Sequence, residues 1–542
     1  MPRTRVVVTA VLGVWVAACG RPAPPPVYDV TVLVPGTSSF HGVHGLRFDR
    51  DGALYAGSVI SQSLFRIDIE SGAVETFVGP PEGMADDLAI GPDGTFVWTA
   101  IEDGIVYARS PTGEIRRIME NQKGVNAVSF SPDGTRLFVS RVFYGDALYE
   151  LDLSGETPAR LILEDLGGLN AFQVAHDGMI YGPLVFGGRV VRIEPDTGVM
   201  TTVSDEFERP GALKLFGDGT ALVLDGGTNG PKLKRVDVTT GETTFVAALP
   251  YDADNLAVNA DARVFVSLSE VNAIVEVDLH TGDFSYVVEP SVLTMPAGLA
   301  VVTQDGLDTL FVGDGFGGVR LVDGQTGEVH DTPIELFMPT HLSSAGDHLI
   351  VGGEVLFGPI QRVHQGTFDV LGAWDGFDAP RDVLEAPNGD LVIAEGGAGR
   401  LVRLTETGTE GGDRNVIAEG LAGPSGLAWA GDDTVYVTET LGGRLVRVNL
   451  ADRSLSVVAS DLWQPEGVAV MPDGTVVVVE VGARRITLID PASREQTVIA
   501  SKLPLGLGSG PSLFRGVAAS PSAIYVTADI GNAIYKLTPR AR

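Results

Sequence analysis

The stretch EGVAVMPDGTVVVVEVGARRITLIDPASREQTVIA, from Glu466 to Ala500, contains the pattern that decides the fold. Four short runs rich in Val and Ile lie at 467–471, 476–480, 486–490 and 496–500. Asp473-Gly474, between the first two runs, is typical of a tight hairpin turn. Glycine and polar residues separate the other runs, and none has the 3.6-residue period of a helix. The stretch therefore predicts four consecutive strands.

The phrase that opens this stretch recurs along the chain as a small or polar residue, then Gly or Ala, an apolar residue and a turn. The twelve copies open at His44, Asp86, Asn126, Asn170, Gly211, Asp254, Ala297, Thr340, Arg381, Ser425, Glu466 and Arg515. Their spacing is 40 to 44 residues, except for 49 before the last copy. Four strands per repeat of this length are the signature of a β-propeller blade. An all-β fold of twelve four-stranded blades of about 43 residues is therefore expected.

Propeller rings usually hold four to eight blades, so twelve blades predict two tandem six-bladed propellers. The predicted division is 1–18 for a signal peptide, 19–28 for a Pro-rich tether, 29–290 for the first propeller and 291–542 for the second. A seven-plus-five division is the alternative, but the residues that open the copies change character near Pro290. The segment 30–34 is a spare strand that could close either ring.

Composition narrows the classes of partner. The chain has 542 residues, 69 of them glycine, and a net charge of -32. The glycine content is nearly twice the usual ~7%, which fits many tight turns. Nucleic acid is excluded as an expected partner, because phosphate binding needs a basic surface. The single cysteine excludes an internal disulfide and any cysteine-cluster metal site.

The N-terminus has the features of an export signal. Arg3 and Arg5 precede an apolar run from Val6 to Val16 that is too short to span a bilayer as an ordinary helix. Val16-Ala17-Ala18-Cys19 then resembles a bacterial lipobox, which makes Cys19 the expected lipidation site. The protein is thus expected in the bacterial cell envelope, anchored to a membrane through Cys19, in the periplasm, at the outer membrane or on the cell surface. The alternative is an ordinary signal peptide that happens to contain a cysteine.

The residue that opens each innermost strand should face the channel of its ring. In the first ring these residues are His44, Asp86, Asn126, Asn170, Gly211 and Asp254. Side-chain oxygens of Asp and Asn are the ligands that a hard cation such as Ca²⁺ prefers. Asn126, Asn170 and Asp254 are therefore the candidate metal ligands, with Asp86 and His44 as candidate catalytic groups. Alternatively, such residues bond the backbone of their own turns.

The second ring differs at the same rim. Its second strands end in acids at Asp314, Glu354, Glu395, Glu439, Glu480 and Asp529. Six acids on one rim could form a face that attracts a cationic partner. The favoured interpretation is structural, because a residue repeated in every blade usually caps backbone N–H groups of a neighbouring loop.

The sequence also resembles a known family. NAVSFSPDGTRLF, from Asn126 to Phe138, and GGRVVRIEPDTG, from Gly187 to Gly198, resemble segments of the SMP-30/gluconolactonase family. Asp254-Asn255 is similar to a phrase of the related paraoxonase-type lactonases. The resemblance implies six-bladed propellers with a channel Ca²⁺ or another divalent cation, and hydrolysis of lactones or esters. The second half is closer to generic NHL-type repeats, which often only bind.

The resemblance is carried to single positions. Asn126 matches a metal-binding Asn of the family, and Asn170 lies where the family has a metal-binding Asp. Asp86 lies where the family has a substrate-site Asn, whereas His44 occupies the position of a first-blade Glu ligand.

Two functions of different classes follow for the chain. One is a cation-dependent lactonase or esterase that acts on a small-molecule lactone or ester at the mouth of the first channel. The other is a non-catalytic scaffold that binds a ligand or a protein partner on its propeller faces. A lyase or carbohydrate-processing enzyme on the same fold is a third option.

Overall fold

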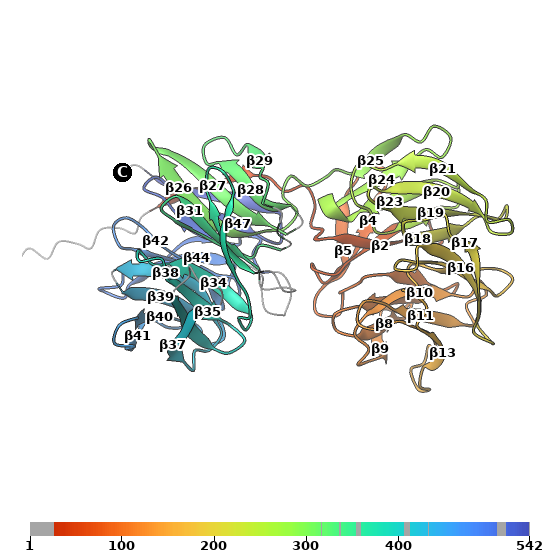
Figure 1. The fold of residues 1–542 in the computed structure, drawn as a ribbon, viewed down its shortest axis with the longest axis horizontal. Coiled ribbons are helices and arrows are strands. Elements are labelled where there is room, and N and C mark those ends of the chain that lie inside the picture. The colour runs from red at the N-terminus through yellow and green to blue at the C-terminus, as the bar shows by residue number, and fades with distance from the viewer. Residues whose placement is uncertain are drawn as a thin grey trace, which may run out of the picture.

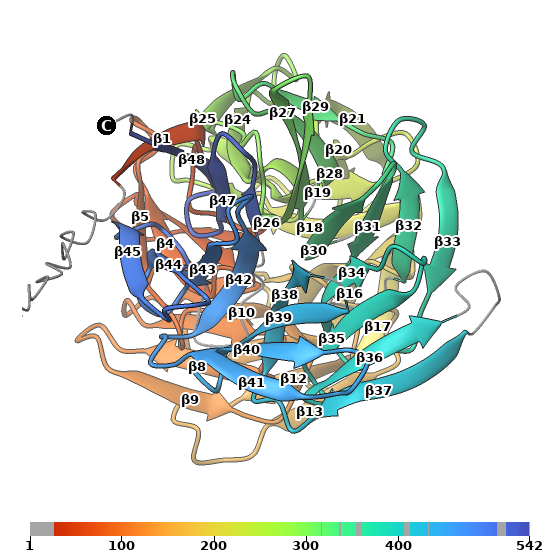
Figure 2. The same cartoon turned by 90° about the vertical axis from the view of Figure 1, so that its left-hand side faces the viewer.

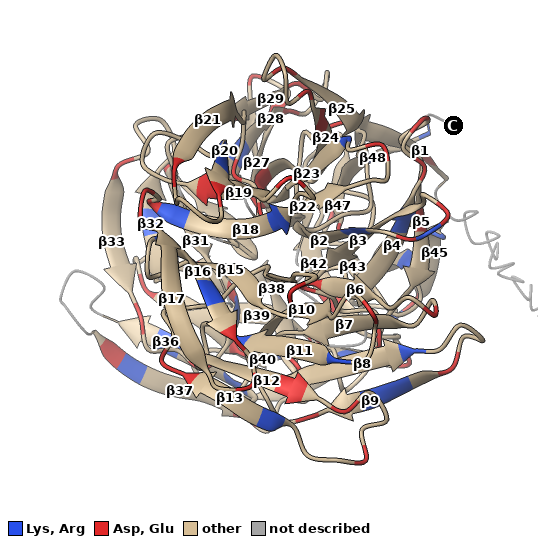
Figure 3. Cartoon of the chain, turned by 90° about the vertical axis from the view of Figure 1, so that its right-hand side faces the viewer, with Lys and Arg blue, Asp and Glu red and all other residues tan. Residues whose placement is uncertain are grey.

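The computed structural model describes residues 27–315, 317–334, 336, 338–353, 359–405, 412–431, 433–506 and 516–540. Within these residues, 48 strands form twelve four-stranded antiparallel sheets. The sheets form two discs that lie side by side in Figure 1, and Figures 2 and 3 look onto the discs from either end. The expected pair of tandem six-bladed β-propellers is confirmed.

The first propeller is built from six sheets of consecutive strands. These are β2(Val43–Phe48), β3(Leu54–Ser58), β4(Ser63–Ile67) and β5(Val74–Val78); β6(Leu88–Ile90), β7(Phe96–Ala100), β8(Ile105–Arg109) and β9(Ile115–Met119); β10(Val125–Phe130), β11(Leu137–Arg141), β12(Ala147–Leu151) and β13(Arg160–Glu164); β14(Gln173–Val174), β15(Ile180–Leu184), β16(Arg189–Glu194) and β17(Val199–Ser204); β18(Arg209–Leu215), β19(Thr220–Gly226), β20(Lys232–Asp237) and β21(Thr243–Ala248); and β22(Leu256–Val258), β23(Val264–Leu268), β24(Ala273–Val277) and β25(Phe284–Val288). A single turn of 3-10 helix, η1(Ser269–Val271), follows β23.

The second propeller has five sheets of consecutive strands and one composite sheet. These are β26(Pro296–Gln304), β27(Leu307–Asp314), β28(Gly318–Asp323) and β29(Val329–Asp331); β30(His341–Ala345), β31(His348–Gly352), β32(Ile360–His364) and β33(Val370–Trp374); β34(Pro380–Glu385), β35(Leu391–Glu395), β36(Arg400–Thr405) and β37(Asp413–Glu419); β38(Pro424–Gly431), β39(Thr434–Glu439), β40(Arg444–Asn449) and β41(Leu455–Ala459); β42(Pro465–Val470), β43(Val476–Glu480), β44(Arg485–Ile489) and β45(Gln496–Ser501); and β46(Val517–Ala519), β47(Ile524–Ala528), β48(Ala533–Pro539) and β1(Tyr28–Val34).

The stretch that predicted the fold forms strands β42 to β45 within two residues of the expected bounds. The hairpin turn between β42 and β43 explains the Asp-Gly pair. Gly474 has φ +87°, a backbone conformation that glycine adopts without steric cost. The Asp473 carboxylate accepts a hydrogen bond from the Thr475 N–H at 2.9 Å, which fixes the turn.

Strand β1 settles how the second ring closes. It pairs antiparallel with β48, from Tyr28 opposite Pro539 to Val34 opposite Ile534. The chain thus begins in the last blade of the second propeller, and the predicted lower bound of the first propeller at residue 29 is wrong. Sequence could not decide this, because a lone strand fits the open edge of either ring.

The first ring closes without a shared strand. Strand β2 of its first blade packs directly against β22 and β23 of its sixth blade. Phe40, Val43 and Leu46 are buried there against Phe265 and Ile274. Apolar packing between the first and last blades therefore completes the ring.

Two linkers join the propellers on the rims where the innermost strands begin. Thr37 and Ser291, one from each linker, share a hydrogen bond between their hydroxyl oxygens at 2.8 Å. The side chain of Asn532, beyond β47, donates to the carbonyl oxygen of Phe40 at 2.8 Å. The His41 ring, buried between the linkers, hydrogen-bonds the carbonyl oxygen of Asp529. The rims that carry the predicted site residues therefore face each other across the gap seen in Figure 1.

Candidate functional site

Four predicted residues of the first ring come together at the mouth of its channel. The His44 side chain, from β2, lies between two carboxylates, with its Nδ1 3.9 Å from Asp86 Oδ1 and 3.7 Å from Asp254 Oδ2. The Asn126 amide, from β10, donates to Asp86 Oδ2 at 2.7 Å. We call His44, Asp86, Asn126 and Asp254 the mouth cluster. It draws on four blades, so only the closed ring assembles it.

The backbone holds the two carboxylates of the mouth cluster in equivalent places. Asp86 and Asp254 each precede a short innermost strand, and their N–H groups donate to the carbonyl oxygens of Thr99 and Ser267, at 2.9 and 3.1 Å. Each accepting residue lies on the second strand of the same blade as its donor, Thr99 on β7 and Ser267 on β23. The repeat therefore aims both side chains at the channel by one local device.

Burial and charge alter the protonation of the mouth cluster. Burial raises the pKa of the Asp86 carboxyl to about 7, and the nearby His44 ring opposes that rise. Burial also lowers the pKa of His44, but the Asp254 and Asp86 carboxylates outweigh this and leave the pKa above its ordinary value. The His44 side chain is 19% exposed and that of Asp254 is 35% exposed, so water reaches both from the gap. The cluster can therefore hold and release a proton near neutral pH.

The donor set fits a divalent cation in part. The side-chain oxygen of Asn126 is buried without a hydrogen-bond partner among the described residues. It lies beside the Asp86 carboxylate, and unsatisfied amide and carboxylate oxygens are typical calcium ligands. Over the described ranges, no group of three or more His, Cys, Asp or Glu side chains is arranged to hold a metal ion. A cation at this mouth therefore depends on the amide oxygen of Asn126 together with Asp86 and Asp254.

Asn170 does not join the mouth cluster through a side-chain hydrogen bond within the described residues, because its oxygen is used locally. That oxygen accepts a hydrogen bond from the next N–H, of Ala171, at 2.9 Å. This is the turn-bonding alternative that the sequence left open.

A second polar layer lies deeper in the same channel. Asp87 is 6% exposed and Asn255 is 2% exposed. Asp87 accepts hydrogen bonds from the Asn255 amide and from the Val128 N–H, both at 3.2 Å. This buried carboxylate thereby ties together the second, third and sixth blades beneath the mouth cluster.

Sequence reasoning missed two cations further along the channel, Arg47 and Lys214. Each interrupts the apolar residues at the end of an innermost strand, in Leu46-Arg47-Phe48 and Leu213-Lys214-Leu215. A charged residue within such a run was the available signal. Both cations act electrostatically on Asp87, and Arg47 also acts on Lys214, so the three side chains lie near one another in the channel.

The acids of the second ring are structural. Asp314, Glu395, Glu439, Glu480 and Asp529 are each at most 2% exposed, and Glu354 lies outside the described residues. Glu480 shows the shared arrangement: it accepts from the Trp463 N–H of the preceding loop at 2.7 Å and from Arg485 at 2.6 Å. Glu439 similarly holds the Ala422 N–H and Arg444. The idea of a cation-attracting face is therefore wrong, and the loop-capping interpretation is confirmed for these residues.

The channel of the second ring combines apolar and polar residues. Apolar surface comes from four innermost strands, through Leu299, Leu342, Leu427 and Val468. The Asp382 carboxylate, from a fifth, also lines the channel and accepts hydrogen bonds from the N–H groups of Val383 and Leu427 at 2.8 and 2.7 Å. Thr340 and Ser425, at two of its rim positions, are buried, and Arg515 lies outside the described residues.

The predicted lipidation site and signal peptide cannot be placed. Cys19 and the whole of 1–26 lie outside the described residues. Among the residues that are described, no helix has the length and apolar character needed to cross a membrane.

Comparisons with known proteins bear on the first propeller. Residues 35–220 match the family described as SMP-30/Gluconolactonase/LRE-like region. A search of curated proteins finds no match to the chain.

Several solved structures are similar at low identity. Selenomethionine-substituted virginiamycin B lyase from Staphylococcus aureus is 13% identical over 69% of this chain and 96% of its own, with a TM-score of 0.25. The extracellular domain of the putative one component system BT4673 from B. thetaiotaomicron is 10% identical over 95% and 84%, with a TM-score of 0.32. A chain of a nidogen/laminin complex is 15% identical over 41% and 88%, with a TM-score of 0.37. The family match confirms the resemblance found in the sequence: the first propeller contains an SMP-30/gluconolactonase/LRE-like region.

Proposed function

We propose that the protein is a hydrolase of the lactonase or esterase type, with its active site at the mouth cluster of the first propeller. The observation that carries this proposal is the convergence of His44, Asp86 and Asp254 around one point beside the unsatisfied oxygen of Asn126. The cluster lies within a propeller that carries the matched family region, which supports the same reaction class.

The proposed cofactor is Ca²⁺ or another divalent cation, held by Asn126, Asp86 and Asp254. When bound, such a cation polarises the carbonyl of a lactone or ester. The three side chains supply one amide and two carboxylate oxygens, a hard donor set that suits calcium.

His44 is the proposed general base. Its buried Nδ1 lies 3.7 Å from Asp254, which orients the ring, and the side chain is 19% exposed, so the other ring nitrogen, Nε2, is the one that would accept a proton from an attacking water. The water oxygen then bonds to the acyl carbon, the acyl C–O bond breaks, and the leaving oxygen takes up the proton. A lactone thereby becomes a hydroxy acid with no other reactant.

A binding role of the second propeller is a separate candidate. Leu441 and Trp463, on its rim toward the gap, are 83% and 64% exposed. Phe143 and Phe186, on the opposing rim of the first propeller, are 61% and 64% exposed and contact each other edge to face, with their ring centroids 5.7 Å apart. Exposed apolar side chains of this kind, three of them aromatic, suit an apolar substrate or a protein partner between the two rims.

We also propose that the protein is exported and lipid-anchored in the bacterial cell envelope through Cys19. Because β1 begins at Tyr28 and belongs to the second propeller, the tether would place that ring next to the membrane. Radiolabelled fatty acid should label the wild-type protein in cells and not Cys19→Ala. Equal labelling of the two proteins would show that Cys19 is not the lipidation site.

The test of the hydrolase uses a panel of lactones and aryl esters with the full chain. We expect turnover that EDTA abolishes and added Ca²⁺ restores, together with a Ca²⁺-dependent rise in melting temperature. Asn126→Ala should lose both effects, whereas Asn388→Ala, in a turn of the second ring, should keep them. Absence of turnover together with a melting temperature unaffected by Ca²⁺ and EDTA would favour the binding role.

A further inference from the structure

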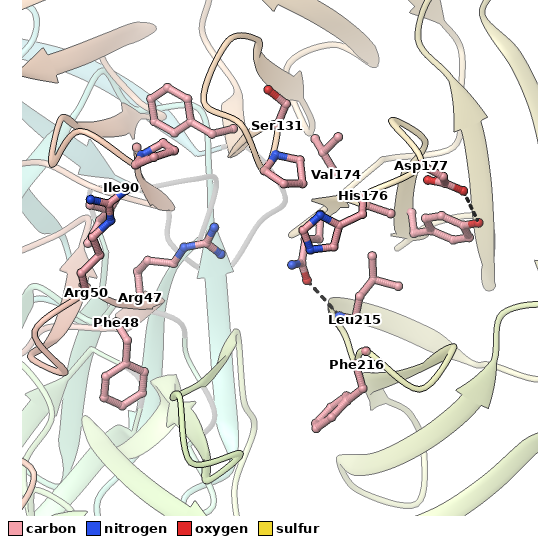
Figure 4. A pocket seen from close by; sticks show the side chains of 18 of the residues that line it. Arg47, Phe48, Arg50, Ile90, Ser131, Val174, His176, Asp177, Leu215 and Phe216 are labelled. Atoms are coloured by element: carbon pink, nitrogen blue, oxygen red, sulfur yellow. Dashed lines mark hydrogen bonds between the residues drawn. The ribbon is translucent and has the colours of Figure 1, made fainter.

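A large pocket lies at the other end of the first channel. It has a volume of about 680 Å³ and opens between the turns that join the first and second strands of the blades. These turns lie on the face shown in Figure 3, away from the second propeller. Figure 4 shows its lining, in which Phe48, Phe216, Val174 and Leu215 supply apolar surface. Its size is within the usual range of small-molecule sites, and it is separate from the mouth cluster.

One cation lines the inner part of this pocket, and a second lies close to it. Arg47, from β2, lines it and points into the open space in Figure 4, and Lys214 precedes the lining residue Leu215 on β18. Lys214 is only 7% exposed. Neither side chain forms a hydrogen bond or an ion pair with any other residue that the structure describes.

The carboxylates nearby do not neutralise this pair. Asp87 acts on both cations, but it is one charge against two and is hydrogen-bonded to Asn255 and the Val128 N–H. Asp49, at the outer turn, accepts from the N–H groups of Asp51 and Ala53.

The remaining charges of the pocket belong to its outer turns. Asp177 accepts from the Met179 N–H at 2.9 Å, and Arg50 is exposed at its own turn. The inner end of the pocket therefore carries an excess of positive charge, in a chain whose net charge is -32.

Burial and the nearby Arg47 charge lower the pKa of Lys214 to about 8. The ammonium group is therefore held where it is less stable than in water. A bound anion would offset that cost, because it supplies the missing opposite charge.

The second propeller provides an internal comparison. A pocket of about 770 Å³ lies at the equivalent turns of that ring. Its Arg403 pairs with Asp390 at 2.8 Å, and its His348 lies 3.0 Å from Asp347. Similar turns thus form a pocket in both rings, but only the pocket of the first ring has cations without ion-pair partners among the described residues.

We propose that the pocket of the first propeller binds an organic carboxylate with an apolar body. The carboxylate would lie against Arg47 and Lys214, where a guanidinium can donate two parallel hydrogen bonds. The apolar body would pack on Val174, Leu215 and the phenylalanine rings toward the opening. This site is independent of the proposed hydrolase, because it shares no residue with the mouth cluster.

Titration calorimetry of the full chain with octanoate tests the proposal. We expect one octanoate per chain, with acetate and octan-1-ol each binding at least about tenfold more weakly, since one lacks the apolar body and the other the charge. Lys214→Met should weaken octanoate binding at least about tenfold. Lys232→Met, on β20 of the same blade, is the matched control and should bind octanoate like the wild type.

Arg47→Gln is the second variant, in case Lys214→Met alters the fold, and circular dichroism checks both. Loss of octanoate binding in either folded variant, with Lys232→Met unchanged, supports the site. Absence of saturable octanoate binding to the wild type, or equal binding by wild type, Lys214→Met and Arg47→Gln, would overturn it. Lactone turnover is measured in parallel, so failure of this site is distinguishable from failure of the hydrolase.

Discussion

The two propellers share one backbone plan but have different channels. In the first ring, polar and charged residues run from the mouth cluster through Asp87 to Arg47 and Lys214. In the second ring, Leu299, Leu342, Leu427 and Val468 line the equivalent space together with Asp382, whose carboxylate is bonded to backbone N–H groups. The channel is lined by a small number of positions on each innermost strand, so changes at those positions alone alter the chemistry of the channel without altering the fold. The difference also shows that fold alone does not locate the function.

The charges of the two rings serve different purposes. In the second ring, five buried acids, each from a different blade, hold the N–H of a loop, and in the blades of Glu439 and Glu480 an arginine follows five residues later. In the first ring, the rim residues differ from blade to blade and meet one another instead. The acid that is repeated from blade to blade therefore has a structural role, whereas the rim residues that vary from blade to blade form the candidate site.

Removing residues 1–35 should give the largest difference in stability between the two rings, because it deletes β1 from the second ring and no strand from the first. We expect the free energy of unfolding of the second propeller to fall by more than about 4 kcal/mol, since a whole strand and its buried contacts are lost. Differential scanning calorimetry with hydrogen exchange assigns the transitions to the rings. Equal destabilisation of both propellers would contradict the assignment of β1 to the second.

Replacing one capping acid should destabilise the second ring alone. Glu480→Ala removes a buried carboxylate and leaves the half-buried Arg485 and the Trp463 N–H without their partner, and we expect a loss of about 3 kcal/mol in the free energy of unfolding. Glu495→Ala, an exposed acid of the same blade, is the control and should change it by less than about 0.5 kcal/mol. Similar effects of the two substitutions in urea unfolding would argue against the capping role.

Asp86→Asn tests whether lactone hydrolysis depends on the first ring and not on the second. It keeps the shape of the side chain but removes the charge beside His44, so we expect kcat/KM for lactone hydrolysis to fall about a hundredfold. Thr340→Val changes the equivalent rim position of the second ring and should leave kcat/KM within about twofold of the wild type. If the two variants lose activity equally, the mouth cluster is not the site of the reaction.

Acidification should weaken the buried linker that joins the rings. Burial lowers the pKa of His41 to about 4, below its ordinary 6.5, so the unfolded chain binds more protons between these two values. Stability then falls as the pH drops below 6.5, and going from pH 7 to pH 5 should cost about 2 kcal/mol from this group. His41→Gln should remove that part of the pH dependence in urea unfolding. An unchanged pH profile in the variant would show that His41 is not the group responsible.

Much of the fold could be predicted from the sequence, because the blade repeat is local. The turn at Asp473-Gly474 and the strands on either side of it follow from residues adjacent in the chain. The closure by β1 could not be predicted, because Val30 and Val32 fit the free edge of a blade in either ring. Whether the acids of the second ring cap loops or face solvent also depended on contacts between segments, such as Glu480 with Trp463.

The candidate site was predictable in part. The rim positions identified His44, Asp86, Asn126 and Asp254, and the ring brings these four together. Asn170 was equally plausible by type, but its side-chain oxygen bonds the adjacent backbone. Arg47 and Lys214 were missed because each is a single charge within an apolar strand, and their proximity arises only when the closed ring brings blades one and five to the same channel.

Calcium titration by calorimetry tests most directly the central claim that only the first of the two rings has a functional channel mouth. We predict one Ca²⁺ per chain for the wild type and for Thr340→Val, and no saturable binding for Asn126→Ala. Two cations per chain, no binding by the wild type, or unchanged binding by Asn126→Ala would contradict the claim.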